Sequence, residues 1–293
     1  MYLDHFEYHA PQTSGQALDL IKSLGDKAKV LAGGTDLLLM MKDKIIKTEH
    51  LIDINNVEEY KGISYEPGKG AVIGAATKIS DVEHSALIQD KYYALHQAAG
   101  VLGSTQVRTM ATIGGNSCHA SPAAETPTPL VALNAKVVLS STSGEREMAL
   151  EEFITGNRLN TLDEGELLTR FVLPDPAPKS VSRYSHIGLR DAMEIDAVNM
   201  AVNLTVGDDG RTVKDLKLVM GSVSPRPLIS AEVPSLMIGK EFNDELVEKA
   251  AQAASEEAKP ISDIRASAEY RRKVVAVLAR RLLQNAFDAA REV

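Results

Sequence analysis

Two pairs of adjacent glycines constrain this chain of 293 residues more than any other feature of its sequence. Gly33-Gly34 stands in Ala-Gly-Gly-Thr-Asp and Gly114-Gly115 in Thr-Ile-Gly-Gly-Asn, each after an apolar or small-residue run. Adjacent glycines let successive backbone N–H groups point to one side and form a nest for an anion, and no Cβ blocks an approaching phosphate. The pairs therefore predict either two tight turns or two loops that grip one phosphate each, or a pyrophosphate together.

The first pair lies in a predicted strand–turn–helix–strand unit. Val30-Leu31-Ala32 precedes it, and a periodic segment from Leu37 to Lys44 and an apolar run over 51–54 follow it, which is typical of a parallel βαβ unit. The pair would then stand at a helix start, where unpaired N–H groups and the helix dipole favour an anion. Thr35 adds a hydroxyl donor, whereas Asp36 carries the wrong charge for phosphate and is predicted to cap the helix or to bind hydroxyl groups.

The chain lacks the signatures of the common nucleotide-binding folds. It contains neither G-x-x-x-x-G-K-[ST] nor G-x-G-x-x-G, so a bound dinucleotide would be held by a different scaffold. The formal charge is -8, from 32 basic and 40 acidic residues, and no block of Lys and Arg offers a path for phosphate backbones. We therefore expect no nucleic-acid partner.

Residues that ligate metals are sparse in the sequence. The one cysteine, Cys118, excludes a disulfide framework and a cysteine-ligated zinc or iron–sulfur centre in this chain, and it is predicted to be a packed residue. Of the seven histidines, the only i, i+4 pair is His5 and His9, without a helix signal, so we predict no metal site. The N-terminus has no signal-peptide pattern and the longest apolar run is 37–41, so a cytoplasmic chain without a membrane span is expected.

Local patterns divide the chain near residue 176, because the segment 173–178 holds three prolines that stop regular structure. Before it, we predict a helix over 14–24 with a Thr13/Gln16 capping box and a Gly25 stop, a hairpin of 63–65 with 71–73, a helix over 92–102, and strands at 136–139 and 167–173. Ser80 and Glu83 repeat the capping-box spacing, and 110–121 is rich in glycine and small polar residues.

After the boundary, strands are predicted over 197–206 and 213–220 and helices over 243–257 and 267–290. In the last helix the predicted inward stripe is Val274, Val277, Leu278 and Leu282, and the residues largely on a solvated face are Arg271, Arg272, Lys273 and Arg280.

Several motifs, in their order and spacing, resemble the FAD-binding medium subunit of molybdenum hydroxylases, the relatives of xanthine dehydrogenase and carbon monoxide dehydrogenase. They are Val30–Leu37, Gly103–Arg108 leading into Thr112–Asn116, and Ala132–Ala135, and the resemblance extends from Ile73-Gly74-Ala75 to Ser267–Arg272. It implies an α+β fold with an N-terminal FAD-binding domain of the vanillyl-alcohol oxidase (PCMH) type, built from two α/β subdomains over residues 1–176. A C-terminal α/β domain with a three-stranded antiparallel sheet and helices would occupy residues 177–293.

The resemblance also implies which residues hold FAD. Two loops would surround the pyrophosphate: Val30, Leu31, Ala32, Gly33, Gly34, Thr35, Asp36 and Leu37 in the first, and Thr112, Ile113, Gly114, Gly115 and Asn116 in the second. Asn116 would add a side-chain hydrogen bond, Leu102 would contact the cofactor, and Glu125 would lie near the adenosine part, where the family commonly has an aspartate. Leu168 would pack on the isoalloxazine and 195–197 would lie near the same ring, or both would belong to the ordinary core. Because Thr35-Asp36 stands where related oxidases tether flavin through a histidine, the FAD would be non-covalent.

The implied function is electron transfer inside a multi-subunit enzyme. A large molybdopterin subunit would hydroxylate the substrate, a small subunit with two [2Fe–2S] clusters would pass electrons on, and FAD on this chain would deliver them to an external acceptor. The chain itself would carry no catalytic residue in the strict sense, and the complex would be a dimer of heterotrimers. The alternatives are a standalone non-covalent FAD-dependent oxidoreductase and a non-enzymatic assembly subunit whose FAD site has decayed.

Overall fold

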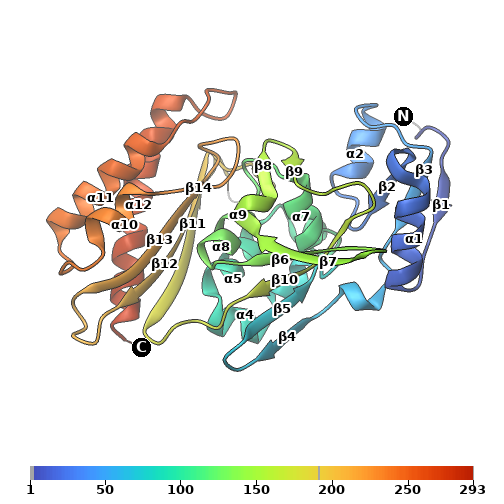
Figure 1. Ribbon diagram of the computed structural model, residues 1–293. Helices are drawn as coiled ribbons and strands as arrows, with labels where there is room; N and C mark the ends of the chain where they lie inside the picture. The colour runs from blue at the N-terminus through green and yellow to red at the C-terminus, as the bar shows by residue number, and fades with distance from the viewer. Residues whose placement is uncertain (1–2, 191, 293) are drawn as a thin grey trace.

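The computed structural model describes residues 3–190 and 192–292, and it arranges them as an elongated molecule with three main sheets (Figure 1). The N-terminal sheet is parallel, in the order β1 (Glu7–His9), β3 (His50–Asp53), β2 (Ala28–Leu31). Helices α1 (Ser14–Leu24) and α2 (Leu37–Lys42) and the 3-10 turns Gly25–Lys27 and Glu58–Tyr60 complete this subdomain. The unit β2–α2–β3 confirms the predicted parallel βαβ arrangement.

Helix α1 has the predicted bounds and half of the predicted capping box. The Thr13 hydroxyl accepts a hydrogen bond from the backbone N–H of Gln16 at 3.3 Å, and Gly25 ends the helix at a φ of 51°. The Gln16 side chain, however, accepts from the backbone N–H of Gln12 at 2.8 Å rather than from that of Thr13. Ala17, Leu18 and Ile21 face inward and build a small core with β3 and Val57.

The second sheet is antiparallel, in the order β4 (Ile63–Glu66), β5 (Gly70–Gly74), β10 (Leu167–Leu173), β6 (Lys136–Ser141), β7 (Gly144–Ala149). The structure confirms the predicted hairpin of β4 with β5 and the strands β6 and β10. Around this sheet lie α3 (Ile79–Glu83), α4 (Ala86–Lys91), α5 (Tyr93–Val101), α6 (Thr105–Arg108), α7 (Ile113–His119), α8 (Pro127–Ala132), α9 (Leu150–Phe153) and the small pair β8 (Ile154–Gly156) and β9 (Leu159–Asn160). The main hydrophobic core fills the space between them.

Two local predictions in this region differ from the structure. Helix α3 begins at Ile79 after Lys78, so Ser80 lies inside the helix and does not cap it. The segment over 110–121 contains α7, which we did not predict, because its glycines and small polar residues give no apolar period. Its Thr112 cap, whose hydroxyl accepts from the backbone N–H of Gly115 at 3.1 Å, starts the helix nonetheless.

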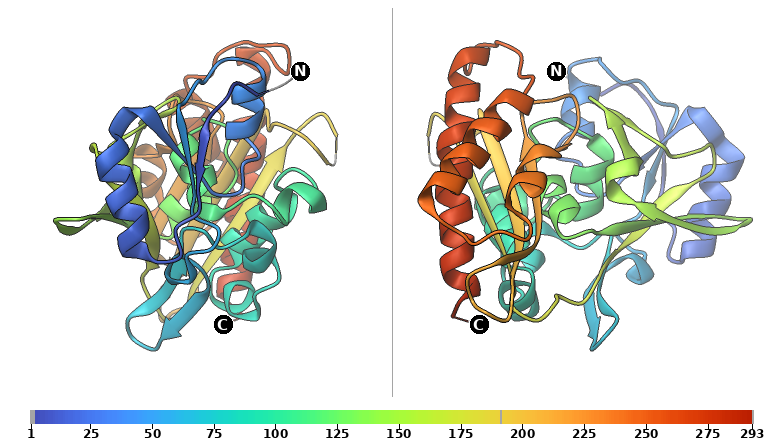
Figure 2. Two further views of the ribbon diagram at one scale, coloured as in Figure 1. Left: turned by 90° about the vertical axis from the view of Figure 1, so that its right-hand side faces the viewer. Right: turned by 60° about the vertical axis from the view of Figure 1, so that its left-hand side comes forward.

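The C-terminal sheet is antiparallel, in the order β11 (Ser180–Ile187), β12 (Val198–Val206), β13 (Val213–Gly221), β14 (Leu228–Ile229). The three long strands are the expected three-stranded sheet, and the two-residue β14 extends it. Helices α10 (Glu232–Met237), α11 (Asp244–Glu257) and α12 (Ala268–Ala290) follow. Figure 2 shows α11 and α12 on the outer face of the sheet, while its other face meets α5 and α8. The fold is therefore α+β, with two N-terminal subdomains followed by a C-terminal domain built on an antiparallel sheet.

The inward face of α12 differs from the prediction at two residues. Val274, Leu278 and Leu282 are buried as expected, but Val277 is 36% exposed. Arg271, expected on the solvated face, is 3% exposed, and its guanidinium donates to the carbonyls of Ala197 at 2.7 Å and Ser222 at 3.1 Å. Buried carbonyls at strand ends need donors, and an arginine one turn before Val274 reaches them.

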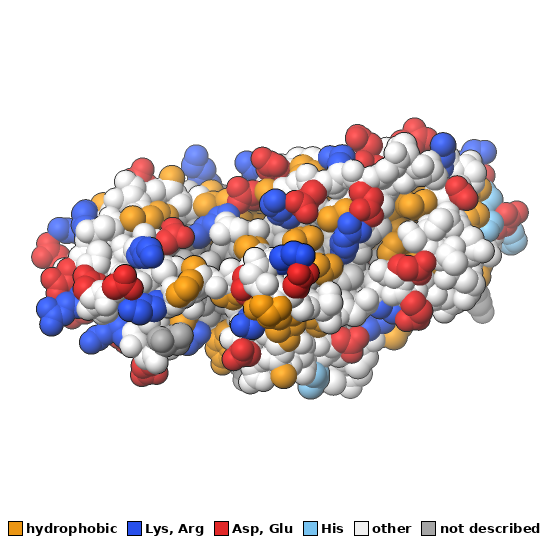
Figure 3. Space-filling view, turned by 60° about the horizontal axis from the view of Figure 1, so that its bottom comes forward, with side chains coloured by type: hydrophobic (Ala, Val, Ile, Leu, Met, Phe, Trp, Pro, Cys, Tyr) orange, Lys and Arg blue, Asp and Glu red, His pale blue; other side chains and the backbone are white. Residues whose placement is uncertain are grey.

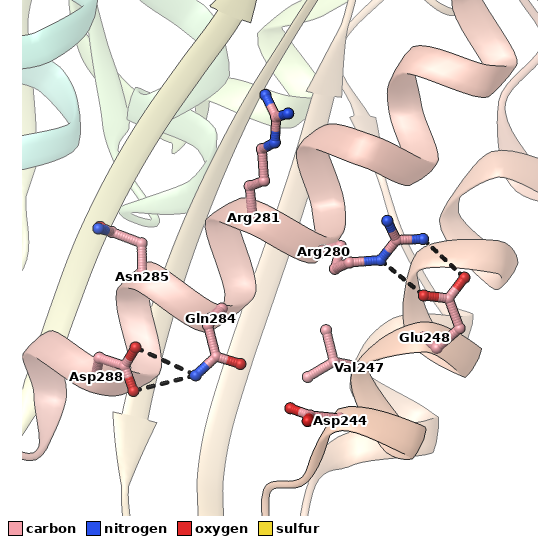
Figure 4. A pocket seen from close by; sticks show the side chains of 8 residues that line it. All are labelled: Asp244, Val247, Glu248, Arg280, Arg281, Gln284, Asn285 and Asp288. Atoms are coloured by element: carbon pink, nitrogen blue, oxygen red, sulfur yellow. Dashed lines mark hydrogen bonds and ion pairs between the residues drawn. The ribbon is translucent and has the colours of Figure 1, made fainter.

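The other predicted surface arginines and lysine of α12 are exposed. Arg272 and Lys273 face solvent, and Arg280 forms a two-bond pair with Glu248 of α11 at 2.7 and 2.8 Å. Figure 4 shows this pair across the groove between the two helices.

On the face of the molecule drawn in Figure 3, acidic and basic side chains alternate without a block of one sign. Within 3–190 and 192–292, no helix is long and apolar enough to cross a membrane.

Candidate cofactor-binding site

The first glycine pair lies against the residues that lead into the second. A Cβ on Gly33 would stand 2.3 Å from the carbonyl oxygen of Met110 and 2.7 Å from the Cα of Ala111, which leads directly into Thr112. A Cβ on Gly114 would stand 2.6 Å from the carbonyl oxygen of Ala75. Since real Cβ atoms do not make such contacts, both positions require glycine for backbone-to-backbone packing. The structure thus brings together the two segments that the sequence singles out.

The first glycine loop, residues 32–36 between β2 and α2, presents a row of unpaired amides. Among the described residues, the backbone N–H groups of Gly33, Gly34, Thr35, Asp36 and Leu37 have no hydrogen-bond acceptor. Gly34 has a φ of 74°, a conformation in which neighbouring N–H groups can converge on an anion. Because α2 has only six residues, we ascribe the affinity for an anion to these amides rather than to a helix dipole.

The second glycine segment, residues 112–116, corrects our expectation that both pairs offer free amides. The N–H of Ile113 donates to the Thr77 carbonyl at 3.1 Å, that of Gly114 to Ala75 at 2.8 Å, and that of Gly115 to the Thr112 hydroxyl. These bonds form because the segment is the first turn of α7 and packs along the residues that follow β5. What the segment offers a ligand is the exposed, side-chain-free surface of Gly115.

Two residues that we did not predict hold the loops together. The Lys78 ammonium donates to the Asn55 side-chain oxygen at 2.8 Å and to the Met110 carbonyl at 3.2 Å, and Asn55 donates to the Ala32 carbonyl at 2.6 Å. Burial lowers the pKa of Lys78. These hydrogen bonds hold the Lys78 ammonium beside the first glycine loop, where its positive charge would attract a phosphate. The position of Asn55 at the carboxyl end of parallel strand β3 is the signal that could have identified it.

The remaining residues of the two segments have distinct surroundings. Val30 and Leu31 belong to β2, Ala32 and Leu37 flank the loop, and Thr35 is partly buried beside Gly34. Asp36 precedes α2 but its side chain makes no capping hydrogen bond, so that prediction was wrong; it is exposed and lies 3.8 Å from the imidazole of His119 at the end of α7. The Asn116 side-chain oxygen accepts from the Thr126 hydroxyl at 2.6 Å, and its amide nitrogen has no acceptor among the described residues.

Four titratable side chains meet where the C-terminal domain joins these segments. Asp196, before β12, accepts from the Tyr184 hydroxyl at 3.2 Å and lies 2.8 Å from the His186 Nδ1. Glu125 is 9% exposed, and burial, followed by the negative charges of Asp196 and Asp36, raises its pKa to about 8. Its carboxyl is therefore neutral at pH 7. Burial, together with Asp196, also raises the pKa of Tyr184 well above its ordinary value.

Three other side chains for which the sequence predicts a role lie in or against the main hydrophobic core. Leu102, after α5, is 5% exposed and Leu168, in β10, is 2% exposed, which fits ordinary core packing, and contact of either with a cofactor remains a prediction. Cys118 packs on the same core, and burial raises the pKa of its thiol to about 12. A thiol with that pKa is protonated at neutral pH, as expected for a packed cysteine.

Comparisons with known proteins match nearly the whole chain. The family described as the FAD binding domain in molybdopterin dehydrogenase matches residues 4–176, and the CO dehydrogenase flavoprotein C-terminal domain matches residues 183–286. The carbon monoxide dehydrogenase medium chain of Hydrogenophaga pseudoflava is 33% identical over 96% of this chain and 97% of its own. The glyceraldehyde dehydrogenase medium chain of Sulfolobus acidocaldarius is 34% identical over 95% of this chain and 97% of its own. A solved structure of the Hydrogenophaga pseudoflava carbon monoxide dehydrogenase, which lacks the Mo-pyranopterin moiety, matches with a TM-score of 0.93 over 99% of both chains.

Proposed function

Because this chain belongs to the family of FAD-binding subunits of molybdopterin dehydrogenases, we propose that it transfers electrons within a molybdenum hydroxylase complex. FAD is its cofactor, and its relatives are flavoprotein subunits of oxidoreductases. In the proposal, electrons arrive from the [2Fe–2S] clusters of a small partner subunit and leave to an external acceptor. A large molybdopterin subunit completes the complex, which we propose to be a dimer of heterotrimers. The domain boundary lies at residues 176/177.

The observation that carries this proposal is the fit of the first glycine loop to a diphosphate. Five consecutive unpaired amides, from Gly33 to Leu37, can donate to phosphate oxygens, and Lys78 supplies a nearby positive charge. Gly115 leaves room for the phosphates on the opposite side, and the free amide nitrogen of Asn116 can donate to them. When bound, FAD supplies the exchange of electrons, which no side chain of the chain can provide.

The flanking residues position the cofactor rather than react with it. Val30, Leu31, Ala32 and Leu37 support the first loop, and Thr112 and Ile113 support the second segment. Glu125, neutral at pH 7, can donate a hydrogen bond to the adenosine part. We propose non-covalent binding, because Thr35 and Asp36 follow the glycine pair and neither side chain forms a stable bond to flavin carbon.

Purification of the chain from its native cells tests the function. We expect a yellow complex in which molybdenum, iron and two partner subunits of unequal size accompany one FAD per copy of this chain. Denaturation with acid should release all of the flavin, since no covalent bond holds it. A yellow chain that purifies alone and oxidises an organic substrate would instead be a standalone oxidoreductase, and a colourless chain with partners would be an assembly subunit.

Exposed apolar side chains mark the surface that we propose for the small iron–sulfur partner. Ile261 is 71% exposed and Ile264 is 98% exposed in the loop between α11 and α12. Arg271 bonds both to Asp263 of this loop at 2.8 Å and to the Ala197 carbonyl, so the loop lies beside the segment that carries Asp196. Electron tunnelling slows steeply with distance. The iron–sulfur partner should therefore dock close to the segment around Asp196, which is expected to lie near the isoalloxazine.

The substitution Ile264→Asp should weaken binding of the small partner by at least about tenfold, because it places a charge where an apolar side chain would be buried. Binding is measured by light scattering and surface plasmon resonance with the separately purified partner. Ile238→Asp, at a 42% exposed position after α10, is the matched control. Flavin content should stay at the wild-type value in both variants. Equal affinities for the partner would exclude this docking surface without affecting the FAD assignment.

A further inference from the structure

Three potential metal ligands converge on the N-terminal sheet, outside the cofactor site. The His9 Nε2 lies 3.1 Å from the His50 Nδ1, and the Glu7 carboxylate lies 3.2 Å from the His50 Nδ1 and 3.9 Å from the His9 Nε2. Among the described residues, this is the group of donors whose ligand atoms all lie within 4.8 Å of one another. In the sequence, His9 has only His5 at helical spacing, and nothing local indicates its approach to His50.

The strand geometry explains why these side chains meet. Glu7 and His9 are two residues apart on β1, so their side chains leave the same face of the sheet. Glu7 stands opposite His50 of the neighbouring parallel strand β3, and the Glu7 N–H donates to the Glu49 carbonyl at 2.8 Å. Backbone pairing, rather than a flexible loop, therefore fixes the relative positions of all three donors.

The distances between the ligand atoms suit a small divalent metal ion. Zinc binds imidazole nitrogen and carboxylate oxygen at about 2.0–2.2 Å in tetrahedral geometry, which places its ligand atoms about 3.3–3.5 Å apart. The three distances here, 3.1, 3.2 and 3.9 Å, bracket that value. Rotation of the 65% exposed Glu7 side chain can correct the longest of them without backbone movement.

The partial burial of the two imidazoles also favours a metal. The His9 and His50 side chains are 25% and 16% exposed, so each has lost part of its hydration while its nitrogen faces that of the other. Without a metal, the pair can form one N–H···N bond, in which one nitrogen carries a proton and donates while the other accepts. A divalent ion satisfies both lone pairs and neutralises Glu7.

We propose that Glu7, His9 and His50 form a binding site for Zn²⁺ or a similar divalent transition metal, with water in the fourth position. The site joins the edge strand β1 to the central strand β3 of a sheet that has only three short strands. Its expected effect is to stabilise the N-terminal subdomain, because a ligand that binds only the folded state raises the unfolding temperature. Flavin binding is not required for this site.

Zinc titration of the full-length chain, prepared without a polyhistidine tag, tests the proposal. Competition with a chromogenic chelator should show one Zn²⁺ per chain, and zinc should raise the unfolding temperature. His9→Gln and His50→Gln should each weaken zinc binding by at least about tenfold, because each removes one of three protein ligands. Glu7→Gln should weaken binding less, since an amide oxygen remains.

His84→Gln, at a histidine whose side chain is 73% exposed on another part of the chain, is the matched control and should bind zinc like the wild type. Unfolding temperatures without zinc identify any variant that fails to fold. X-ray absorption at the zinc edge should show two imidazoles among nitrogen and oxygen ligands. The proposal is wrong if the chain binds no Zn²⁺ in stoichiometric amount, or if the His9 and His50 variants bind it like the wild type.

Discussion

Gly33→Ala should release FAD from the full-length chain while its hydrophobic cores stay folded. The new Cβ would stand 2.3 Å from the Met110 carbonyl oxygen, so the first glycine loop must move away from the segment that leads into α7. That movement disperses the unpaired amides. Loss of two or more charge-assisted hydrogen bonds, each worth about 1.5–3 kcal/mol, should weaken FAD binding at least about 100-fold. The ratio of flavin to protein absorbance after gel filtration, and titration of apoprotein with FAD, measure the effect.

Three further glycine variants separate the cofactor site from general stability. Gly15→Ala in α1 meets no atom within 4 Å and should keep its FAD with slightly higher stability. Gly115→Ala requires only the Thr112 hydroxyl, 2.9 Å away, to move, so it should fold normally but lose FAD. Gly114→Ala meets the Ala75 backbone and should lower the unfolding temperature of the apoprotein. Wild-type flavin content in both the Gly33 and the Gly115 variants would falsify the site.

The sequence predicts the convergence of the two glycine segments for a local reason. Gly33 and Gly114 each follow an apolar or small-residue run, and a glycine in a packed segment is suited to close approach of another backbone. The same reasoning accounts for the parallel βαβ unit and the hairpin of β4 with β5, because turn residues and apolar runs alternate over short distances there.

The sequence could not predict which amides remain free. The N–H of Gly114 is paired because the Ala75 carbonyl, in the turn after β5, lies 2.8 Å away, and no pattern near Gly114 encodes that neighbour. Arg271 is buried for the same kind of reason, since its partners at Ala197 and Ser222 are far away in sequence. The convergence of His9 with His50 likewise depends on strand pairing. Tertiary neighbours, rather than local preferences, decide these cases.

Glu125 shows how a residue known from sequence gains its chemistry from the fold. The resemblance implies only that a carboxylate lies near the adenosine part of FAD. The structure adds that this carboxyl is 9% exposed and shares its surroundings with the carboxylates of Asp196 and Asp36. The negative charges of Asp196 and Asp36 act on this carboxyl, so ionisation of Glu125 would add repulsion near a cofactor that carries two phosphates. Keeping Glu125 protonated reduces that repulsion.

The free energy of unfolding should therefore depend on pH through Glu125. Its pKa rises from 4.5 in the unfolded chain to about 8 in the folded one, so between these values the folded state holds a proton that the unfolded state has lost. The stabilisation is complete below pH 4.5 and is lost as pH rises through 8. At about 1.4 kcal/mol per pH unit, the contribution changes by no more than about 5 kcal/mol. Glu125→Gln, which has the same shape and no titration, should remove this dependence.

Urea unfolding of the apoprotein between pH 5 and 9 measures the difference between wild type and Glu125→Gln. That difference should favour the wild type least at high pH, where the buried carboxylate must be charged. Asp196→Asn should reduce the slope of stability against pH, because it removes the negative charge that raises the pKa of Glu125 most. Glu241→Gln, at an exposed position, controls for a general change in charge. Parallel pH profiles for wild type and Glu125→Gln would show that Glu125 is ionised in the folded chain. The carboxyl could then not donate a hydrogen bond to the adenosine, and the proposed role of Glu125 in FAD binding would have to be abandoned while the glycine loop kept its own.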